Sequence, residues 1–470
     1  MNIKIRFLGA AQNVTGSQYV VEANNQKVMI DCGYYQERGL QERNWQPFKV
    51  QPTSLDAVLL THAHLDHCGL LPKLVKDGLR AKIYCSSATG DIAKIVMSDS
   101  AKIQEEDVAF KKKRHRKEGR KGKHPPVPLF TLEDAERTGN LMRYVNFETP
   151  VQIAEGFEAT FYESGHILGA ASILLKVRVG DETRTILFSG DIGRSEVPIL
   201  RDPTLFTEGV DYVVMESTYG DREHPEGKAI DEQLAEVVNE AHRQRGNVII
   251  PSFAVERSQE LMYYLGELLE QKRIPPTMVL VDSPMAVRVT DVFRRHPELF
   301  DEETMERLSR GNHPCDFPSL KLIRTVEQSK AINSIRGTVI IIAGSGMCTG
   351  GRIKHHLKAN MGEPENTILF VGYQAVGTLG RIIVEGAKSV RLFGEKRDVR
   401  ARVAQIGGFS GHAGKSELLH WVSSIEVKPR RVFVTHGEDE VALGFAKTLE
   451  TELGIPSIAP EYDSEHSLDS

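Results

Sequence analysis

The sequence predicts a layered α/β protein in which helices cover the faces of its sheets. Short apolar stretches repeatedly run into polar turns: residues 28–30 precede Asp31, and residues 432–434 precede Thr435. Amphipathic segments follow several of these turns. Strands with continuous rather than alternating apolar residues are typical of sheets that are buried on both faces. With 470 residues the chain is too long for one ordinary core, so two or more domains are expected.

The order strand, loop, helix recurs in the middle of the chain. Strand-like residues 247–250, 278–281 and 338–342 are each followed by a loop rich in serine, proline or glycine and then by a helical pattern. This repeated order is typical of a doubly wound sheet with helices on both faces. The sequence therefore predicts a second α/β domain in this region.

Composition narrows the class of protein. Hydrophobic residues make up 40% and charged residues 26% of the chain, as in a globular protein. No apolar stretch reaches the roughly 18 residues that a membrane span needs, and the first residues lack the long apolar core of a signal peptide. The five cysteines are scattered with no Cys-x-x-Cys pair, so we expect buried thiols rather than disulfides or a thiolate metal site. These features predict a cytoplasmic protein with no membrane partner.

Positive charge concentrates in one segment, although the net charge of the chain is −5. Residues 111–123 contain a run of lysine and arginine that only Glu118 opposes. Such a run is typical of a nucleic-acid-binding surface. A solvated, flexible insertion without a partner is the alternative, and the sequence leaves both interpretations open.

Residues 62–67 include four side chains that can bind metal, directly after the apolar strand of residues 57–60. Two imidazoles with one residue between them, followed by a carboxylate and a third imidazole, can serve two adjacent ions. Three further donors occupy similar strand-end positions, which argues against a histidine-rich surface turn. The candidate metal ligands are His62, His64, Asp66, His67, His166, Asp191 and His436.

The segment His62-Ala63-His64-Leu65-Asp66-His67, with a later histidine and aspartate, resembles the hallmark of the metallo-β-lactamase superfamily. The resemblance implies an αββα sandwich that binds a pair of metal ions. One set of ligands would be His62, His64 and His166, and the other would be Asp66, His67 and His436. By the same resemblance Asp191 would bridge the two ions, and Asp31 would orient the histidines from outside. Nitrogen and oxygen ligands favour two zinc ions and leave manganese or iron open.

Several stretches between residues 216 and 412 are similar to the β-CASP family, whose members cleave nucleic acids. These stretches are residues 216–220, 251–255, 282–286, 344–353, 371–374 and 408–412. The similarity covers essentially the whole chain. It implies a metallo-β-lactamase domain of residues 1–208 and 396–470, into which a doubly wound β-CASP domain of residues 209–395 is inserted. A histidine at the position of His436 is typical of RNA-cleaving members, so the resemblance implies single-stranded RNA as the partner. It also leaves room for a homodimer.

The closest resemblance is to RNA-processing nucleases, which implies metal-dependent hydrolysis of RNA with 5′-phosphate and 3′-hydroxyl ends. Metal ions lower the pKa of bound water enough for it to ionise near neutral pH. His412 is the candidate general acid for the leaving 3′-oxygen, and Glu216 would keep it protonated. The candidate catalytic residues are therefore Asp66, Glu216 and His412. The structural alternatives are a strand-end salt bridge for Glu216 and a capping role for His412.

Substrate contacts are expected from the second domain. Residues 344–346 form a glycine-rich turn between a strand and the helical pattern of residues 351–357. Such a turn lets the backbone approach a phosphate and directs N–H groups toward it. The candidate RNA phosphate-binding residues are Ser252, Ser345, Gly346 and Arg352. A tight packing turn is the alternative.

Two other functions compete with a ribonuclease. A small-molecule hydrolase of the same superfamily would need no inserted domain. A non-catalytic RNA-binding scaffold, like the inactive relatives of the polyadenylation nuclease, would have lost metal ligands that this chain keeps. A flavodiiron-type oxidoreductase is disfavoured, because that branch usually has a glutamate at the position of His64.

Overall fold

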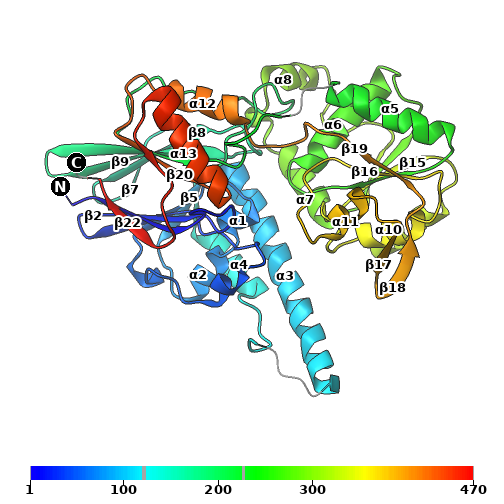
Figure 1. Cartoon of the computed structure of the whole chain (residues 1–470), viewed down its shortest axis with the longest axis horizontal. Coiled ribbons are helices and arrows are strands. Elements are labelled where there is room, and N and C mark those ends of the chain that lie inside the picture. The colour runs from blue at the N-terminus through cyan, green and yellow to red at the C-terminus, as the bar shows by residue number, and fades with distance from the viewer. Residues whose placement is uncertain (1, 119–122, 225–227, 469–470) are drawn as a thin grey trace. The chain divides into compact units, whose positions relative to one another are not determined.

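A computed structural model gives the structure of the chain and describes residues 2–118, 123–224 and 228–468 (Figure 1). The chain forms two compact units. Unit 1 comprises Met1–Ser195, Asp202–Glu223 and His412–Ser470, and unit 2 comprises Glu196–Arg201 and His224–Gly411. The units divide at residues other than the predicted boundaries 208 and 396. The strand Tyr212–Glu216 pairs with two strands of unit 1, and the strand Arg402–Gln405 pairs with a strand of unit 2.

Unit 1 contains two seven-stranded sheets. The first has the order β22 (Ser464–Ser467), β1 (Lys4–Gly9), β2 (Gln18–Ala23), β3 (Gln26–Ile30), β4 (Ala57–Leu59), β5 (Lys82–Cys85) and β6 (Met142–Tyr144). The second has the order β21 (Ser457–Ile458), β20 (Arg431–Thr435), β11 (Tyr212–Glu216), β10 (Glu182–Phe188), β9 (Ala171–Val179), β8 (Phe157–Glu163) and β7 (Val151–Ala154). The neighbours from β3 to β6 run parallel, as do β10, β11, β20 and β21.

Aromatic side chains fill the space between these two sheets. The ring centroids of Phe7 on β1 and Phe433 on β20 lie 5.0 Å apart, and Phe161 and Phe188 are buried in the same cluster. Each such ring buries roughly 150–250 Å², so these contacts dominate the attraction between the sheets.

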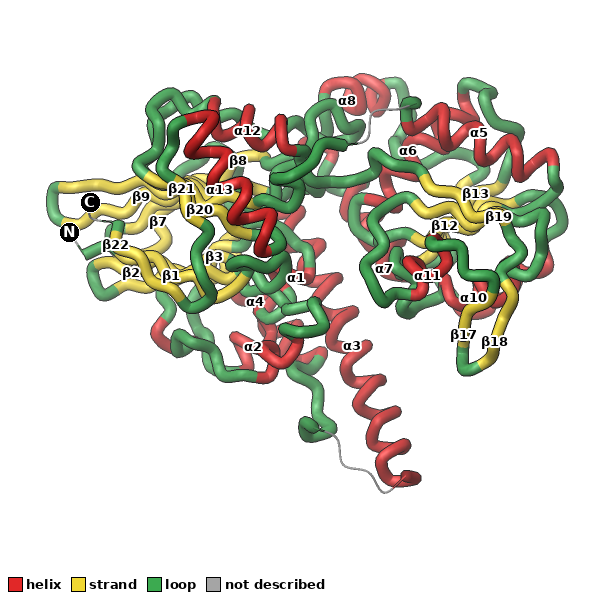
Figure 2. Tube along the Cα trace, viewed as in Figure 1, coloured by secondary structure: helices red, strands yellow, loops and turns green. Residues whose placement is uncertain are grey.

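Helices cover the outer face of each sheet in unit 1 (Figure 2). These helices are α1 (Leu65–Cys68), α2 (Leu71–Lys76), α3 (Ser87–Glu118) and α4 (Leu132–Leu141) beside the first sheet, and α12 (Lys415–Ser423) and α13 (Asp439–Leu453) beside the second. Trp421 of α12 and Phe445 of α13 are buried against the second sheet. The layers are therefore helix, sheet, sheet, helix, which confirms the predicted αββα sandwich.

Unit 2 is built around a six-stranded parallel sheet. Its order is β14 (Leu320–Leu322), β13 (Met278–Val281), β15 (Val339–Ala343), β12 (Val248–Pro251), β16 (Thr367–Phe370) and β19 (Arg402–Gln405). The helices are α5 (Ile230–Arg243), α6 (Arg257–Glu270), α7 (Pro284–Phe293), α8 (Glu302–Ser309), α9 (Val326–Ala331), α10 (Ile353–Asn360) and α11 (Leu379–Val384), and β17 (Ser389–Leu392) pairs with β18 (Glu395–Asp398). One core cluster joins the sheet to α5, α6 and α7, and another joins it to α10 and α11. The predicted doubly wound second domain is confirmed.

The basic segment of residues 111–123 begins inside a helix. α3 runs without interruption for 32 residues and ends at Glu118. Residues 119–122 of the basic segment lie outside the described residues. Across the described parts of the chain, no helix combines the length and the apolar composition that crossing a membrane requires.

Candidate metal centre

The candidate metal centre of unit 1 lies where parallel strands of both sheets end. The histidine turn, residues 61–67, follows β4, and Asp31 follows β3. In the second sheet Asp191 follows β10, and His436 follows β20. Because the carboxyl ends of neighbouring parallel strands meet at one edge of a sheet, segments far apart in the sequence come together here.

Backbone contacts fix the histidine turn against the loop after β3. The N–H of Cys32 donates to the carbonyl of His67 at 2.7 Å, and the N–H of Ser17 donates to that of Asp66 at 2.9 Å. Gly33 approaches so closely that a Cβ atom on it would stand 1.6 Å from the carbonyl oxygen of Asp66. Only glycine at this position allows the turn to pack where it does.

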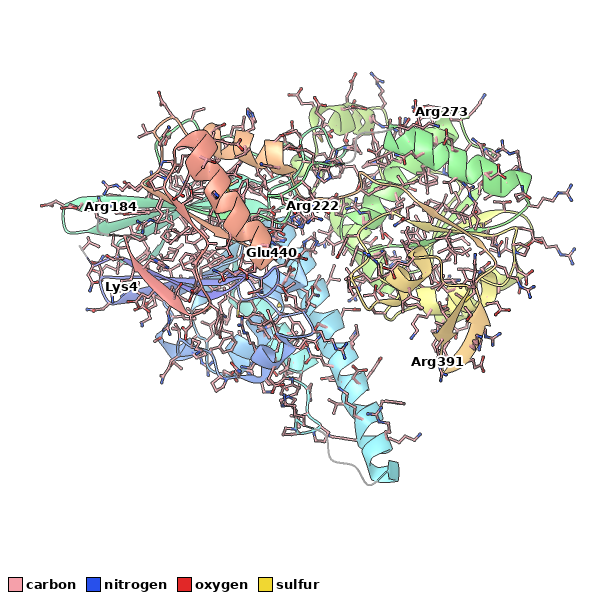
Figure 3. All side chains as sticks on the ribbon, in the orientation of Figure 1. Lys4, Arg184, Arg222, Arg273, Arg391 and Glu440 are labelled. Carbon is pink, nitrogen blue, oxygen red and sulfur yellow. The ribbon has the colours of Figure 1, made fainter. Side chains whose placement is uncertain are left out.

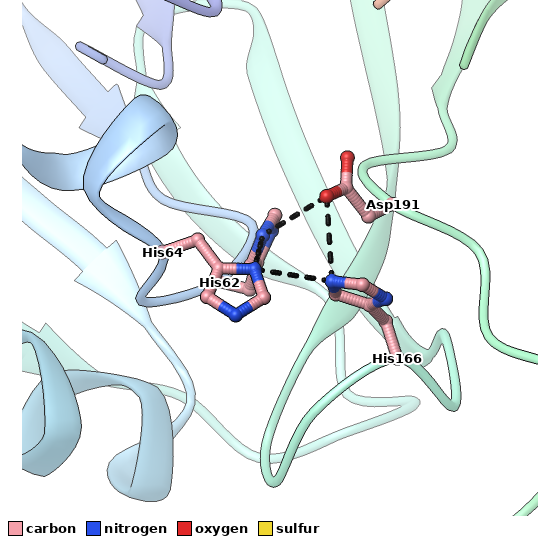
Figure 4. Close-up of side chains that lie close together, drawn as sticks. All are labelled: His62, His64, His166 and Asp191. Atoms are coloured by element: carbon pink, nitrogen blue, oxygen red, sulfur yellow. Dashed lines mark hydrogen bonds and ion pairs between the residues drawn. The ribbon is translucent and has the colours of Figure 1, made fainter. Parts of the chain in front are cut away.

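A first group of ligand atoms comes from three histidines and one aspartate (Figure 4). The Nδ1 atom of His64 lies 3.2 Å from His62 Nε2 and 3.1 Å from His166 Nε2. The Oδ2 atom of Asp191 lies 3.3 Å from His62 Nε2 and 3.4 Å from His166 Nε2. Four tetrahedral ligands placed about 2.0–2.1 Å from a zinc ion would be about 3.3–3.4 Å apart, close to these spacings.

Asp66, His67 and His436 form a second group, and Asp191 joins the two groups. The Oδ1 atom of Asp191 lies 3.3 Å from His67 Nε2 and 3.6 Å from His436 Nε2. His436 Nε2 is also 3.5 Å from Asp66 Oδ2. The two oxygens of Asp191 thus face different groups, Oδ2 the first and Oδ1 the second, as a bridging carboxylate would.

The chemistry of these buried atoms fits a divalent metal ion. Asp191 and His436 are 2% and 3% exposed, and within the described ranges neither Asp191 Oδ1 nor His436 Nε2 has a hydrogen-bond partner. A buried polar atom left unpaired costs about 1–3 kcal/mol. Imidazole nitrogen and carboxylate oxygen are ligands that zinc accepts, so a bound cation would satisfy both atoms.

Burial keeps the imidazoles of the first group in the neutral form that binds metal. It lowers the pKa of His64 to about 3. Burial, together with the positive charge of His412, also holds the pKa of His166 well below its ordinary value. Because a proton and a metal ion compete for the same nitrogen, a low pKa favours the metal.

Asp31 orients His67 from outside the two groups. Its Oδ2 atom accepts a hydrogen bond from His67 Nδ1 at 2.7 Å, which directs Nε2 of that ring toward Asp191. Thr61 donates to both oxygens of Asp31, from its N–H at 2.8 Å and from its hydroxyl at 2.8 Å. The sequence predicted this role for Asp31 but not the role of Thr61, which directly precedes the first histidine.

Replacing Asp31 with asparagine is expected to weaken metal binding by about 10- to 100-fold, because the ring of His67 loses the carboxylate that fixes it. Asparagine tolerates the positive φ of 57° at this position, so the fold should persist. Competition with a chromophoric chelator measures the affinity directly. Unchanged affinity in a folded D31N variant would contradict the orienting role.

His436 is oriented by Thr218, a role that the sequence pattern did not predict. His436 Nδ1 lies 3.1 Å from the hydroxyl oxygen of Thr218, and that hydroxyl also donates to the backbone carbonyl of His436 at 3.2 Å. This pairing directs Nε2 toward Asp191. The N–H of His436 in turn donates to the carbonyl of Ala10 at 2.8 Å. Thr218 lies two residues after Glu216, in the stretch of residues 216–220 that is similar to the β-CASP family. That position was the only sequence feature that could have indicated its role.

Glu216 and His412 form a pair beside the first group. Nδ1 of His412 lies 3.1 Å from each carboxylate oxygen of Glu216, and its Nε2 lies 4.0 Å from Asp191 Oδ2. Burial alone would lower the pKa of His412, but the charge and hydrogen bond of Glu216 outweigh burial and raise the pKa to about 9. The ring is thus held protonated with one nitrogen directed toward the metal-binding cluster.

The four candidate RNA phosphate-binding residues lie in unit 2. Ser252 is 1% exposed, and its hydroxyl bonds to the carbonyl of Phe253. The hydroxyl oxygen of Ser345 accepts hydrogen bonds from two N–H groups of its own loop, at positions 349 and 350. Arg352 donates to the buried Asp282 at 2.6 Å. These internal bonds explain a packing role for the loop, and a phosphate-binding role remains a prediction.

Gly346 is required by the packing of this loop. A Cβ atom at position 346 would stand 2.9 Å from the ring of Phe253 and 3.1 Å from its backbone nitrogen. Gln374 donates to the carbonyl of Gly346 at 3.1 Å. Loops that follow the adjacent strands β12, β15 and β16 therefore meet at Gly346.

Three protein-family models match the chain. The metallo-β-lactamase superfamily matches residues 12–219, the β-CASP domain matches residues 258–383, and the Zn-dependent metallo-hydrolase RNA specificity domain matches residues 396–460. The third model lies over the segment that carries His412 and His436.

Curated relatives are similar over almost the whole chain. Ribonuclease TTHA0252 of Thermus thermophilus is 38% identical over 94% of this chain and 94% of its own length. The transcription termination factor FttA of Methanosarcina mazei is 31% identical over 97% of this chain and 70% of its own length. The RNase J-like protein of Methanocaldococcus jannaschii is 30% identical over 97% of this chain and 98% of its own length.

A solved structure shares the fold. The crystal structure of a protein of unknown function from Enterococcus faecalis V583 aligns with a TM-score of 0.54 at 12% identity, covering 99% of this chain and 100% of that one.

Proposed function

Because the chain belongs to the β-CASP branch of the metallo-β-lactamase superfamily, we propose that it hydrolyses phosphodiester bonds of single-stranded RNA with two zinc ions. Cleavage would leave 5′-phosphate and 3′-hydroxyl ends. The observation that carries this proposal is the pair of ligand groups joined by the two oxygens of Asp191. The printed name of the ribonuclease relative and the matched RNA specificity domain support RNA as the substrate.

In this proposal the two groups of ligand atoms each hold one zinc ion. His62, His64 and His166 hold the first, and Asp66, His67 and His436 hold the second, with Asp191 shared. Bound there, the ions would lower the pKa of a water molecule toward 7 and neutralise charge on the phosphate. Asp66 is 17% exposed at its side chain, so it also borders the space that substrate must reach.

His412 donates the proton that the leaving 3′-oxygen needs. Its Nδ1 is held by Glu216, so the acidic proton is the one on Nε2. Glu216 is itself fixed, because one of its oxygens accepts the backbone N–H of Ile192 at 2.6 Å. A general acid with a pKa near or above the working pH stays protonated between turnovers.

Replacing Glu216 with glutamine is expected to move the alkaline limb of the kcat profile to lower pH by about 1 to 3 units. The pKa of His412 is raised by the carboxylate, so removal of that charge lowers it. The protonated, active fraction of His412 is then lost at a lower pH. The amide oxygen still accepts the N–H of Ile192, and the longer hydrogen bond from the N–H of Thr218 to the other oxygen is lost. Rates measured from pH 6 to pH 10 test this prediction, and an alkaline limb at its wild-type position would contradict it.

The decisive assay for the proposed function uses RNA labelled separately at its 5′ and 3′ ends, with and without chelator. We expect cleavage that chelator abolishes and added zinc restores, with 5′-phosphate products that a phosphatase can dephosphorylate. DNA of the same sequence is the control substrate. Cleavage that persists in chelator would contradict the metal requirement. Activity on a thioester or lactam alone would favour a small-molecule hydrolase, and RNA binding without cleavage would favour a scaffold.

A further inference from the structure

Residues 109–114 of α3 form an exposed basic surface that the proposed metal centre does not use. The helix is about 48 Å long at 1.5 Å per residue. Its first half is anchored, since Ala88, Ile92, Met97 and Ala101 are fully buried. From position 109 to position 114 every side chain is exposed. Figure 3 shows side chains projecting on several sides of this part of the helix.

Two faces of α3 differ in this region. One face is tied to the chain that follows: the side chains of Gln104 and Glu105 accept the backbone N–H groups of residues 129 and 132 at 3.0 and 3.1 Å. Successive helical residues are 100° apart, so Phe110, Lys113 and Arg114 share the opposite face. The ring of Phe110 is 65% exposed there. We call these three residues the α3 tip.

The α3 tip carries positive charge that the described part of the protein does not neutralise. Residues 111–114 are four consecutive cations, and within the described ranges none of them forms an ion pair. On the same helix Asp107 lies four residues before Lys111 and Glu118 lies four residues after Arg114, so Lys112 and Lys113 have no acidic residue within one turn. An exposed cluster of like charge stabilises nothing in the fold, but it attracts a polyanion.

The segment that returns from α3 is fastened to unit 1. Lys123 donates to Glu42 at 2.6 Å, and the ring of His124 stacks on Trp45 with centroids 4.5 Å apart and planes 3° apart. The first half of α3 and the segment that begins at Lys123 are therefore both anchored in unit 1.

We propose that the α3 tip is an accessory binding site for single-stranded RNA, in which Lys113 and Arg114 contact phosphates and a base stacks on Phe110. This inference rests on the proposed function, because it concerns how the same substrate is held. Exposed aromatic rings next to cations are the combination that binds single strands without sequence preference. A second copy of this chain is a poorer partner, because two α3 tips would bring like charges together.

The test compares RNA binding by two tip variants with that of the wild type. Lys113→Gln/Arg114→Gln removes both cations and keeps good helix formers. Each lost phosphate contact reduces the magnitude of the slope of log K against log salt concentration by about 0.7. The double variant removes two contacts, so its slope should be smaller by about 1.4. Its binding at 0.1 M salt should be about 25-fold weaker. Phe110→Ala should weaken binding by about 5- to 150-fold without changing the slope.

The matched control is Lys428→Gln/Lys447→Gln, which removes the same charge from exposed positions elsewhere on unit 1. It should keep the wild-type slope. Fluorescence anisotropy with a labelled 30-nucleotide RNA is measured in chelator, so that binding is read without cleavage. Circular dichroism verifies that the helix persists in each variant.

The outcomes separate this proposal from the proposed function. A wild-type salt slope in Lys113→Gln/Arg114→Gln, or an equal loss in the control, overturns the α3 tip as an RNA site. The proposal is also overturned if the double variant differs from the wild type in sedimentation coefficient but keeps the wild-type salt slope of RNA binding. That result assigns the surface to a protein partner. If the tip variants lose binding while the wild type cleaves no RNA, the proposed function fails and the α3 tip stands.

Discussion

The variant His412→Ala is expected to bind RNA and both metal ions yet turn over about 10²- to 10⁴-fold more slowly, the usual contribution of general acid catalysis. His412 contributes no atom to the two proposed ion positions, and its Nε2 is 4.0 Å from Asp191 Oδ2. In this variant the leaving 3′-oxygen would lose its proton donor, while the residues proposed to hold the metal ions stay in place. Single-turnover rates with saturating enzyme isolate this step.

His420→Ala is the matched control for this variant. His420 is an exposed histidine on α12, eight residues along the chain, and it should be replaceable without loss of rate. A substrate whose leaving group needs no proton provides a second control: His412→Ala should cleave an activated nitrophenyl phosphodiester almost as fast as the wild type. A wild-type rate on RNA in His412→Ala would remove this residue from the mechanism.

The variant Asp191→Ala is expected to lose both metal ions and all metal-dependent activity. Its two oxygens serve the two groups separately, Oδ2 the first and Oδ1 the second. Saturating zinc at 1,000 times its dissociation constant stabilises a protein by about 4 kcal/mol for each bound ion. The melting temperature of the wild type should therefore rise with zinc, and that of Asp191→Ala should not.

Mass spectrometry of the purified wild type and variant measures how many metal ions each chain binds. Asp221→Ala is the control, because Asp221 is an exposed aspartate near Glu216 that pairs only with the adjacent Arg222 among the described residues. One ion retained by Asp191→Ala would show that the carboxylate serves a single position. Two retained ions would contradict a bridging role.

The sequence was most informative where chemistry is local. The histidine turn packs its donors into residues 62–67, and a strand precedes it, so the pattern itself predicts convergence on metal. The structure brings all seven predicted ligands into two groups joined by Asp191. The recurring apolar strands followed by turns predicted layered α/β domains, one of them doubly wound. The αββα sandwich with its inserted domain followed from the resemblance of the histidine motif to the metallo-β-lactamase superfamily.

The sequence was least informative where a side chain depends on a distant partner. Arg352 has the chemistry of a phosphate ligand, but Asp282, seventy residues away, accepts its hydrogen bond. Thr61 and Thr218 orient Asp31 and His436 through hydroxyl groups that no spacing rule distinguishes from other threonines. The basic run at residue 111 left two interpretations open, because charge alone does not reveal that α3 extends into it as far as Glu118.

Unit 1 is built from segments that precede and follow unit 2 in the sequence, and this arrangement determines when its metal centre can form during synthesis. Strand β22 pairs with β1, and His436 reaches back to Ala10, so this unit needs residues from both extremes. Residues 224–411 of unit 2 leave the ribosome as one continuous stretch before residues 412–436 appear. His436 belongs to the second ligand group, so a nascent chain has no complete set of ligands until all of unit 2 has been translated.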